Sequence, residues 1–330
     1  MAGLPVTVVV VPRERFSHAR RSLESIYANT AGPFALVYVD GGSPRVLRRY
    51  LAAEQRRLGF RLVQTDCFLT PNEARNLGLR YVDTRYVVFI DNDVEVTSGW
   101  LDALVRCAEE SQAWLVGPLC FVGPPASEII HVAGGEVAIH EEGARRVLHQ
   151  LQRYEGRRPA EVALPLAAER SGLAEFHCML ARTDLFARLG PLDEALLNTR
   201  EHIDLCLRVT AAGGSIYFEP RARVAYVAPP PLAWSDVPFY LVRWSDQWTR
   251  ATMRHFEKTW QVRLDTGRPG IMRARRTIAF RPIRDLIRRL GGTWAPAIEW
   301  RSLRALDAAL GPLALAAATR KRRRRRIRAG

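Results

Sequence analysis

Short apolar runs alternate with longer amphipathic segments from Val6 to Ile90, and this alternation constrains the fold more than any other feature of the sequence. Apolar runs bounded by turn residues are typical of buried strands, whereas the longer segments have helical spacing. The expected strands are Val6–Val11, Ala35–Val39, Phe60–Thr65 and Tyr86–Ile90, and the expected helices are Ser17–Tyr27, with Ser17 as its candidate cap, Val46–Leu58 and Pro71–Tyr81. Strand–helix–strand units in this order predict an α/β fold.

The last of these strands leads directly into Asp91-Asn92-Asp93, although burying an unpaired carboxylate is costly. Ligands of open α/β sheets gather outside the carboxyl ends of strands, and Asp40 ends a neighbouring strand in the same manner. We therefore expect all three aspartates to lie at a solvent-filled mouth. In an extended segment Asp91 and Asp93 point the same way, and hard oxygen ligands suit Mg²⁺ or Mn²⁺ shared with substrate phosphates. A capped turn is the alternative, because Asp-Asn-Asp is also ordinary turn chemistry.

The remainder of the chain divides at Pro229-Pro230-Pro231, the clearest boundary in the sequence. Before it the pattern is mixed, with helices expected over Thr183–Arg188 and over Glu201–Ala212, where Gly213-Gly214 would stop the second helix. We expect a first domain over residues 1–228, a helical extension over 229–319 and a basic disordered tail over 320–330. Within the extension, three aromatic residues spaced four apart are expected on one helix face packed against the first domain: Tyr240, Trp244 and Trp248.

The chain has 330 residues and a formal net charge of +15, and eight of its basic residues lie between Arg320 and Arg328. A pI near 10.4 suggests a nucleic-acid-binding protein. However, the other basic residues are dispersed and no recognised nucleic-acid motif appears, so we expect no specific nucleic acid partner. The alternative explanation of the arginine excess is the base composition of the coding sequence, which would carry no functional meaning. The basic tail beside the apolar stretch Leu310–Ala318 favours an anionic membrane surface, and a solvated tail without a partner is the alternative.

The five cysteines are scattered and include no Cys-x-x-Cys pair, which predicts reduced thiols rather than a disulfide framework or a zinc site. We find no signal peptide and no apolar run of membrane-spanning length. These features predict a cytoplasmic protein, peripheral at most on the cytoplasmic face of the membrane.

Several short motifs follow one another over roughly residues 5 to 227: Val37–Ser43 (VYVDGGS), Asn72–Leu79 (NEARNLGL), Asp91–Asp93 with Gly99-Trp100-Leu101, Ala181–Glu194 and Thr199–Arg208 (TREHIDLCLR). Their order resembles glycosyltransferase family 2, whose members have a nucleotide-sugar-binding GT-A fold. The resemblance implies a Rossmann-like mixed sheet flanked by helices, with a C-terminal helical extension. It divides residues 1–228 into a nucleotide-sugar-binding half, 1–100, and an acceptor half, 101–228.

The resemblance also implies roles for particular residues. Asp40 would contact the base or ribose of the donor, and Arg75 would lie near the nucleotide or its diphosphate. Asp91 and Asp93 would complete the donor site by holding a divalent metal, Mn²⁺ or Mg²⁺. The acidic motif on the acceptor side supplies the general base and acceptor contacts from Glu201, His202 and Asp204. An inverting transfer needs such a base, because the acceptor hydroxyl loses its proton as it attacks the anomeric carbon.

Two positions depart from the family pattern. Glu201-His202 stands where the family often has Glu-Asp, and histidine can itself act as a base near neutral pH. Tyr226 lies near the place where the family often has a histidine as a further metal ligand. The other histidines, His131, His140 and His177, show no metal-ligand spacing, although His177-Cys178 is placed near the acceptor site by chain order.

Together these observations predict an inverting, metal-assisted glycosyltransferase that uses a nucleotide-diphosphate sugar. Its acceptor would be a hydroxyl group of a glycan or of a lipid-linked saccharide. A glycosidase, which also needs two carboxylates, and a basic nucleic-acid-binding protein are the alternatives.

Overall fold

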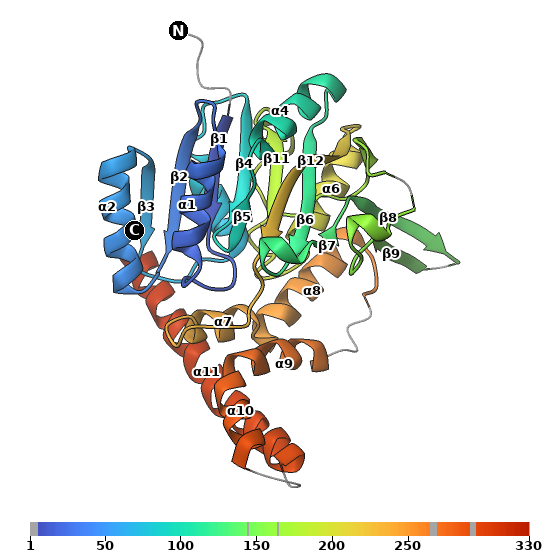
Figure 1. The fold of residues 1–330 in the computed structure, drawn as a ribbon. Helices are drawn as coiled ribbons and strands as arrows, with labels where there is room; N and C mark the ends of the chain where they lie inside the picture. The colour runs from blue at the N-terminus through green and yellow to red at the C-terminus, as the bar shows by residue number, and fades with distance from the viewer. Residues whose placement is uncertain (1–5, 144, 164, 265–268, 291–294, 330) are drawn as a thin grey trace.

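A mixed sheet forms the centre of the computed structural model, which describes residues 6–143, 145–163, 165–264, 269–290 and 295–329 (Figure 1). From one edge to the other its strands are β10 (Glu169–Ser171), β12 (Ile216–Tyr226), β6 (Leu115–Val122), β11 (Cys178–Arg182), β4 (Tyr86–Asp91), β1 (Val6–Val11), β2 (Ala35–Gly41) and β3 (Arg61–Thr65). Two short strands lie off this path: β5 (Val94–Val96) pairs with β12, and β7 (Ile129–Val132) pairs with β6. A separate hairpin joins β8 (Gly135–Glu142) to β9 (Arg145–Gln152).

The half of the sheet from β4 to β3 is parallel. Strand β1 pairs in parallel with both β2 and β4, so that Val9 lies between Val37 and Phe89, and β2 pairs in parallel with β3. The carboxyl ends of these strands therefore meet at one edge of the sheet, as the sequence analysis expected. The other half is mixed, because β11 runs antiparallel to β4 and β6 whereas β12 is parallel to β6.

Helices cover both faces of the sheet, which explains why its strands are continuous apolar runs. In β1, Val8 and Val10 join one hydrophobic core, with side chains of α1 (Ala19–Asn29), α2 (Arg45–Leu58) and α4 (Trp100–Ser111). Val9 and Val11 join the core on the other face, with side chains of α3 (Pro71–Leu79), α5 (Leu185–Leu189) and α6 (Glu201–Ala211).

The expected strands and helices up to Asp91 are confirmed to within two residues at each end. The candidate cap at Ser17 is wrong. Helix α1 begins after His18, and the Ser17 hydroxyl instead donates to Asp236 Oδ2 at 2.5 Å. Asp236 also accepts the main-chain N–H groups of Phe16 and Ser17, and this buried carboxylate anchors the C-terminal extension to the loop between β1 and α1.

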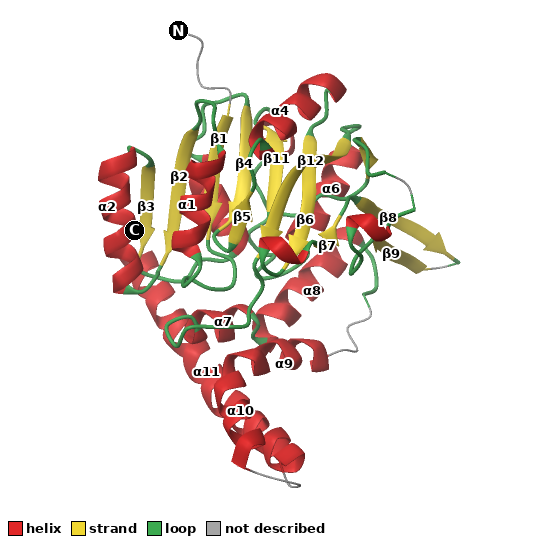
Figure 2. Cartoon of the chain, viewed as in Figure 1, coloured by secondary structure: helices red, strands yellow, loops and turns green. Residues whose placement is uncertain are grey.

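The extension lies below the carboxyl ends of the parallel strands (Figure 2). It consists of α7 (Val237–Arg243), α8 (Asp246–Trp260), α9 (Pro269–Thr277), α10 (Arg281–Leu290) and α11 (Ala295–Ala329). The prediction of one helix carrying three aligned aromatic residues is wrong. The chain breaks at Ser245, whose side chain caps α8, so Tyr240 lies on one helix and Trp248 on the next.

Two of the three predicted aromatic residues pack among the helices of the extension. Tyr240 and Trp244 are buried together with Phe280 and Leu303, whereas Trp248 belongs to a small cluster against which Phe68 of the first domain packs. The expected packing of an aromatic stripe on the first domain is therefore met only in part.

The C-terminal segment expected to be disordered continues α11 to Ala329. Arginine and lysine are strong helix formers, and the preceding turns of α11 supply a folded template for them. The side chains from Arg320 onward, residues 1–5 and Gly330 lie outside the described residues. In the described part of the chain, no helix has both the length and the apolarity required to cross a bilayer.

Candidate functional site

The middle residue of the Asp-Asn-Asp triplet fixes the loop between β1 and α1 above the strand ends. Asn92 Oδ1 accepts the main-chain N–H of Arg13 at 3.0 Å, and its side-chain amide donates to the carbonyl of Arg15 at 3.0 Å. The main-chain N–H of Asn92 continues the pairing with β1 by donating to Val11. The triplet thus holds in place a loop whose side chains line the site.

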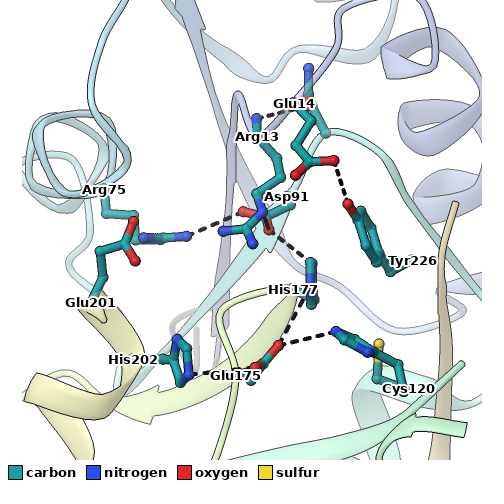
Figure 3. Close-up of polar contacts among 12 residues, drawn as sticks. Arg13, Glu14, Arg75, Asp91, Cys120, Glu175, His177, Glu201, His202 and Tyr226 are labelled. Atoms are coloured by element: carbon teal, nitrogen blue, oxygen red, sulfur yellow. Dashed lines mark hydrogen bonds and ion pairs between the residues drawn. The ribbon is translucent and has the colours of Figure 1, made fainter. Parts of the chain in front are cut away.

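Asp91 is fully buried in a cluster with the side chains of Arg13, Arg75 and His177 (Figure 3). Its Oδ1 accepts a hydrogen bond from Arg75 Nη2 at 3.2 Å. Its Oδ2 lies 3.5 Å from Arg13 Nε and 3.2 Å from His177 Nδ1. Burial alone would raise the pKa of Asp91, but the contact with His177 and the charges of Arg13 and Arg75 lower it. The expected solvent-filled mouth is therefore wrong for Asp40, Asp91 and Asp93, which are all buried. At Asp91, cationic side chains of the chain itself neutralise the carboxylate.

Asp93 is equally buried but has no such partners. Neither of its carboxylate oxygens has a hydrogen-bond partner among the described residues. Burial and the nearby charges of Asp91 and Glu14 raise its pKa well above the ordinary value. An orphaned, buried carboxylate fits a divalent cation, which would supply the missing partner. Of the two predicted metal ligands, Asp93 thus has free oxygens, whereas both oxygens of Asp91 face cations.

Tyr226 lies beside this carboxylate, where the family often has a histidine. Its hydroxyl donates to Glu14 Oε2 at 2.5 Å, and Glu14 also pairs with Arg275 of the extension at 3.3 Å. Tyr226 therefore holds Glu14 in the site. Glu14 and Arg13 are site residues that the sequence analysis missed.

Helix α3 places Arg75 under the cluster. The Glu73 carboxylate accepts the main-chain N–H of Thr70 at 2.8 Å, and Pro71 occupies the first helical position, so the start of the helix is fixed. One turn later the fully buried Arg75 guanidinium stacks over the Phe176 ring at 3.8 Å, while Nη2 reaches Asp91. A cation held in this manner is oriented before any ligand arrives.

A chain of contacts leads from Asp91 to the acceptor-side motif (Figure 3). His177 Nε2 lies 3.4 Å from Glu175 Oε2, and Glu175 Oε1 lies 3.4 Å from His202 Nε2. Burial lowers the pKa of His177 to about 4 and also lowers that of His202, so both imidazoles are neutral near pH 7. Burial opposes ionisation of Glu175, but the surrounding histidines, first His202 and then His131, hold its pKa well below the ordinary value.

Glu175 was also missed. His131 and His177, which show no metal-ligand spacing in the sequence, both lie beside it in the structure. His140 lies apart from them on β8. Glu175 and His177 are separated by one residue just before β11, and in extended chain such residues point the same way. The one-residue separation of Glu175 and His177 was therefore the sequence signal that could have placed their side chains on one side of the chain. The contribution of His131 from β7 depends on tertiary structure alone.

Glu201 and His202, at the start of α6, both face the cluster. Glu201 is buried beside Arg75, and its Oε1 lies 3.9 Å from a guanidinium nitrogen of Arg243 in the extension (Figure 3). Burial, followed by the charge of Arg13, lowers the pKa of Arg243 to about 10. The extension thus contributes a cation to the site.

The structure separates Asp204 from these residues. Its Oδ1 accepts a hydrogen bond from Trp260 Nε1 at 3.0 Å, and Oδ2 lies 3.6 Å from Arg208. It lines a different cavity of about 590 Å³, together with Asp193 and Glu194. Of the three candidate bases, Glu201 lies beside Arg75 and His202 contacts Glu175, whereas Asp204 contacts neither group (Figure 3).

Asp40 lies at the carboxyl end of β2, next to an open cavity of about 760 Å³. The carboxylate is buried; it accepts the Ser43 N–H at 3.0 Å and the Gln64 side-chain amide at 3.3 Å. The cavity is lined by Phe16, Gly42, Ser43, Pro44, Arg45, Arg48, Gln64, Thr65, Asp66, Cys67, Phe68, Ser235 and Pro238. Its volume is in the range that small-molecule ligands occupy.

The sequence of this chain is similar to a known protein family and to individual bacterial proteins. Residues 7–151 match the family described as Glycosyl transferase family 2. An uncharacterised protein, y4gI, of Sinorhizobium fredii is 25% identical over 72% of this chain, and the pre-mycofactocin glycosyltransferase of Mycobacterium tuberculosis is 27% identical over 67% of it. The chain spans only 26% and 42% of the lengths of these two proteins.

A solved structure with a similar fold is the crystal structure of GalNAc-T7 with UDP, GalNAc and Mn²⁺. It matches with a TM-score of 0.53 and 17% identity, over 84% of this chain and 55% of that one. At this level of identity the likeness establishes the fold, which is of the GT-A type.

Proposed function

Because residues 7–151 match glycosyltransferase family 2, we propose that the protein transfers a glycosyl group from a nucleotide-diphosphate sugar to a hydroxyl acceptor with inversion at the anomeric carbon. One observation supports the proposal above all. Donor-side and acceptor-side residues that lie far apart in the sequence meet at the carboxyl ends of β1 and β4. Asp91 is linked through His177 and Glu175 to His202 by contacts of 3.2 to 3.4 Å.

The donor nucleotide occupies the cavity beside Asp40 in this proposal. The Asp40 carboxylate is oriented by Ser43 and Gln64, and hydrogen bonds to a base or ribose would use its remaining acceptor capacity. From this cavity the diphosphate extends toward Arg75 and Arg13. Guanidinium groups bind phosphate oxygens through paired hydrogen bonds, so these two cations stabilise the negative charge that develops on the leaving group.

We assign the general base to His202. A neutral imidazole can accept the proton of the acceptor hydroxyl as that oxygen attacks. Its Nε2 lies 3.4 Å from the Glu175 carboxylate, whose negative charge would stabilise the imidazolium formed when the proton arrives. Glu201 is the second candidate, and in this arrangement it orients the acceptor beside Arg243.

Asp93 is the residue that best fits a divalent cation, with Asp91 as a charged neighbour. Mn²⁺ or Mg²⁺ there would neutralise charge on the donor diphosphate. The positions of Arg13 and Arg75 favour a contribution of these two side chains to the neutralisation of the diphosphate charge. We therefore expect activity to fall, rather than vanish, when the cation is removed.

We further propose that the acceptor is a saccharide, free or lipid-linked, and that the basic end of α11 binds anionic lipid at the cytoplasmic face of the membrane. Clustered basic residues gain roughly 1 kcal/mol each near such a surface, and salt weakens the attraction. Co-sedimentation with anionic vesicles at moderate salt tests this. A variant ending at Thr319 should fail to pellet, and equal pelleting of the two proteins would reject membrane binding without affecting the proposed reaction.

The reaction is tested with a panel of nucleotide-diphosphate sugars, each with and without Mn²⁺. A donor at 100 times its Kd stabilises the fold by about 2.7 kcal/mol, which thermal unfolding detects. We expect one nucleotide to raise Tm and its sugar to be released slowly to water, whereas the free sugar has no effect. If no member of the panel raises Tm or is hydrolysed, the proposed function is wrong.

A further inference from the structure

Glu175 and His177, which lie just before β11, also face a third side chain that the proposed transfer reaction does not use, His131 on β7. We propose that these three side chains bind a transition-metal dication, Zn²⁺ in the first place, at a site distinct from Asp93. The proposal stands independently of the proposed function, because it concerns metal binding by the chain without donor or acceptor.

The spacing of the candidate ligand atoms carries the inference. Glu175 Oε2 lies 3.5 Å from His131 Nε2 and 3.4 Å from His177 Nε2, and the ligand atoms of all three residues lie within 4.8 Å of one another. Zinc bonds to nitrogen and carboxylate oxygen of about 2.0–2.1 Å in a tetrahedral arrangement place neighbouring ligand atoms about 3.4 Å apart. Two imidazoles with one carboxylate form a ligand set that zinc uses when a further coordination position stays open.

The same distances argue against a plain hydrogen-bonded cluster. Charge-assisted hydrogen bonds from nitrogen to a carboxylate oxygen are shorter, about 2.7–2.9 Å. Neither imidazole reaches Glu175 Oε2 at such a distance. The three groups are therefore too far apart for good direct hydrogen bonds and suitably spaced for a common cation.

The surroundings of the ligands have the features that accompany metal sites. His177 presents its other ring nitrogen, Nδ1, to Asp91 Oδ2 at 3.2 Å, and the Tyr226 ring stacks on His177 with centroids 4.0 Å apart. The second oxygen of Glu175 accepts a hydrogen bond from the Gln152 side chain at 2.8 Å. Metal-binding histidines usually give their second nitrogen to a carboxylate, and metal-binding carboxylates are themselves hydrogen-bonded.

A small cavity adjoins two of the three ligands. It has a volume of about 10 Å³, enough for roughly one water molecule, and is lined by Glu175 and His177, with Cys120 and Val132 on its other sides. An ion held by all three side chains would tie β7, which carries His131, to the segment before β11. It would thereby fix Glu175, the carboxylate that faces His202.

Metal analysis of the full-length chain tests the proposal. After treatment with a chelator and dialysis, the protein is titrated with ZnCl₂ in a calorimeter, and bound zinc is counted by elemental analysis. We expect one equivalent of zinc, with affinity at least about 100-fold lower in His131→Gln and in His177→Ala. Asp91→Asn, which removes the outer carboxylate, should weaken binding about 10–100-fold.

His149→Ala is the matched control, because His149 also pairs with a glutamate, Glu142 at 3.0 Å, but on the exposed hairpin. Its zinc affinity should equal that of the wild type, and so should that of Asp93→Asn. Circular dichroism checks that each variant is folded, and His131→Gln is included because the His131 side chain is 21% exposed and tolerates change. A wild-type chain that binds no stoichiometric zinc, or folded His131 and His177 variants that bind it as tightly, would overturn the proposal.

Discussion

The cavity beside Asp40 and the cluster around Asp91 lie at the same edge of the sheet, but they handle charge differently. In the cavity, Arg48 pairs at 3.0 Å with Asp66, whose side chain is 93% exposed. In the cluster, Asp91 and Arg75 pair at 3.2 Å with both side chains 0% exposed. Water screens the first pair, which can rearrange around a ligand, whereas the second is fixed in a medium where electrostatic interactions are strong.

In the proposed reaction, this difference implies separate tasks for the two regions. The open cavity can select the nucleotide, because its groups exchange water for ligand at low cost. The closed cluster can stabilise charge during the reaction, because its groups need no reorganisation. Substitutions in the two regions should therefore have different signatures.

The largest effect is expected for His202→Ala at the closed end. Loss of a general base should lower turnover of the donor about 10²–10⁴-fold while donor affinity is unchanged. Steady-state kinetics and donor titration measure the two quantities separately. His140→Ala, the same change on the separate hairpin, is the control. A parallel loss of donor affinity would instead place His202 in the nucleotide pocket, and unchanged turnover would transfer the base to Glu201.

Asp91→Asn should destabilise the fold by about 3–5 kcal/mol, because it leaves buried cations without their counter-charge. The cost is measured as the change in free energy of unfolding in urea. Asp66→Asn removes the matching charge from the exposed pair of the cavity and should cost less than about 1 kcal/mol. Similar costs for the two variants would contradict the contrast between the regions.

The smallest effect concerns the wall of the cavity. Gly42 has φ +78°, and an added Cβ would lie 2.9 Å from the carbonyl carbon of Cys67. Gly59 has φ +74° with no atom within 4 Å of the same position. Both alanine variants carry the cost of the left-handed backbone, about 1–2 kcal/mol, and crowding should add roughly 1–3 kcal/mol in Gly42→Ala alone.

Urea denaturation measures the difference in free energy of unfolding between Gly42→Ala and Gly59→Ala. Donor titration should show weaker nucleotide binding only in Gly42→Ala. Equal stability and equal donor affinity of the two variants would mean that Gly42 does not shape the cavity.

The sequence predicted the parallel half of the fold well because the signals there are local. Turn residues bound each apolar run, which predicts a strand. Consecutive apolar residues such as Val8, Val9 and Val10 also predict that both faces of the strand are buried. The same local reasoning placed Asp91 at a strand end.

Local reasoning could not show what surrounds that strand end. Asp91 was expected in water because a lone carboxylate belongs there, but its partners come from Arg13, Arg75 and His177, which are distant in the sequence. Asp204 fits the family motif by spacing, yet the rotation of α6 turns it toward Trp260. Side-chain direction and long-range pairing decide such cases, and neither is encoded in a motif.

The anchoring of the extension has a consequence for the order in which the site is completed. Asp236 holds the residues just before α1 from a sequence distance of 220 residues, and Arg275 reaches Glu14 across 261. During synthesis from the N-terminus, the first strand and its loop leave the ribosome long before either partner exists. Contacts of such separation close late and slowly. The nascent chain would therefore carry an unfinished site, and the competence to react would be acquired only after Asp236 and Arg275 have been made.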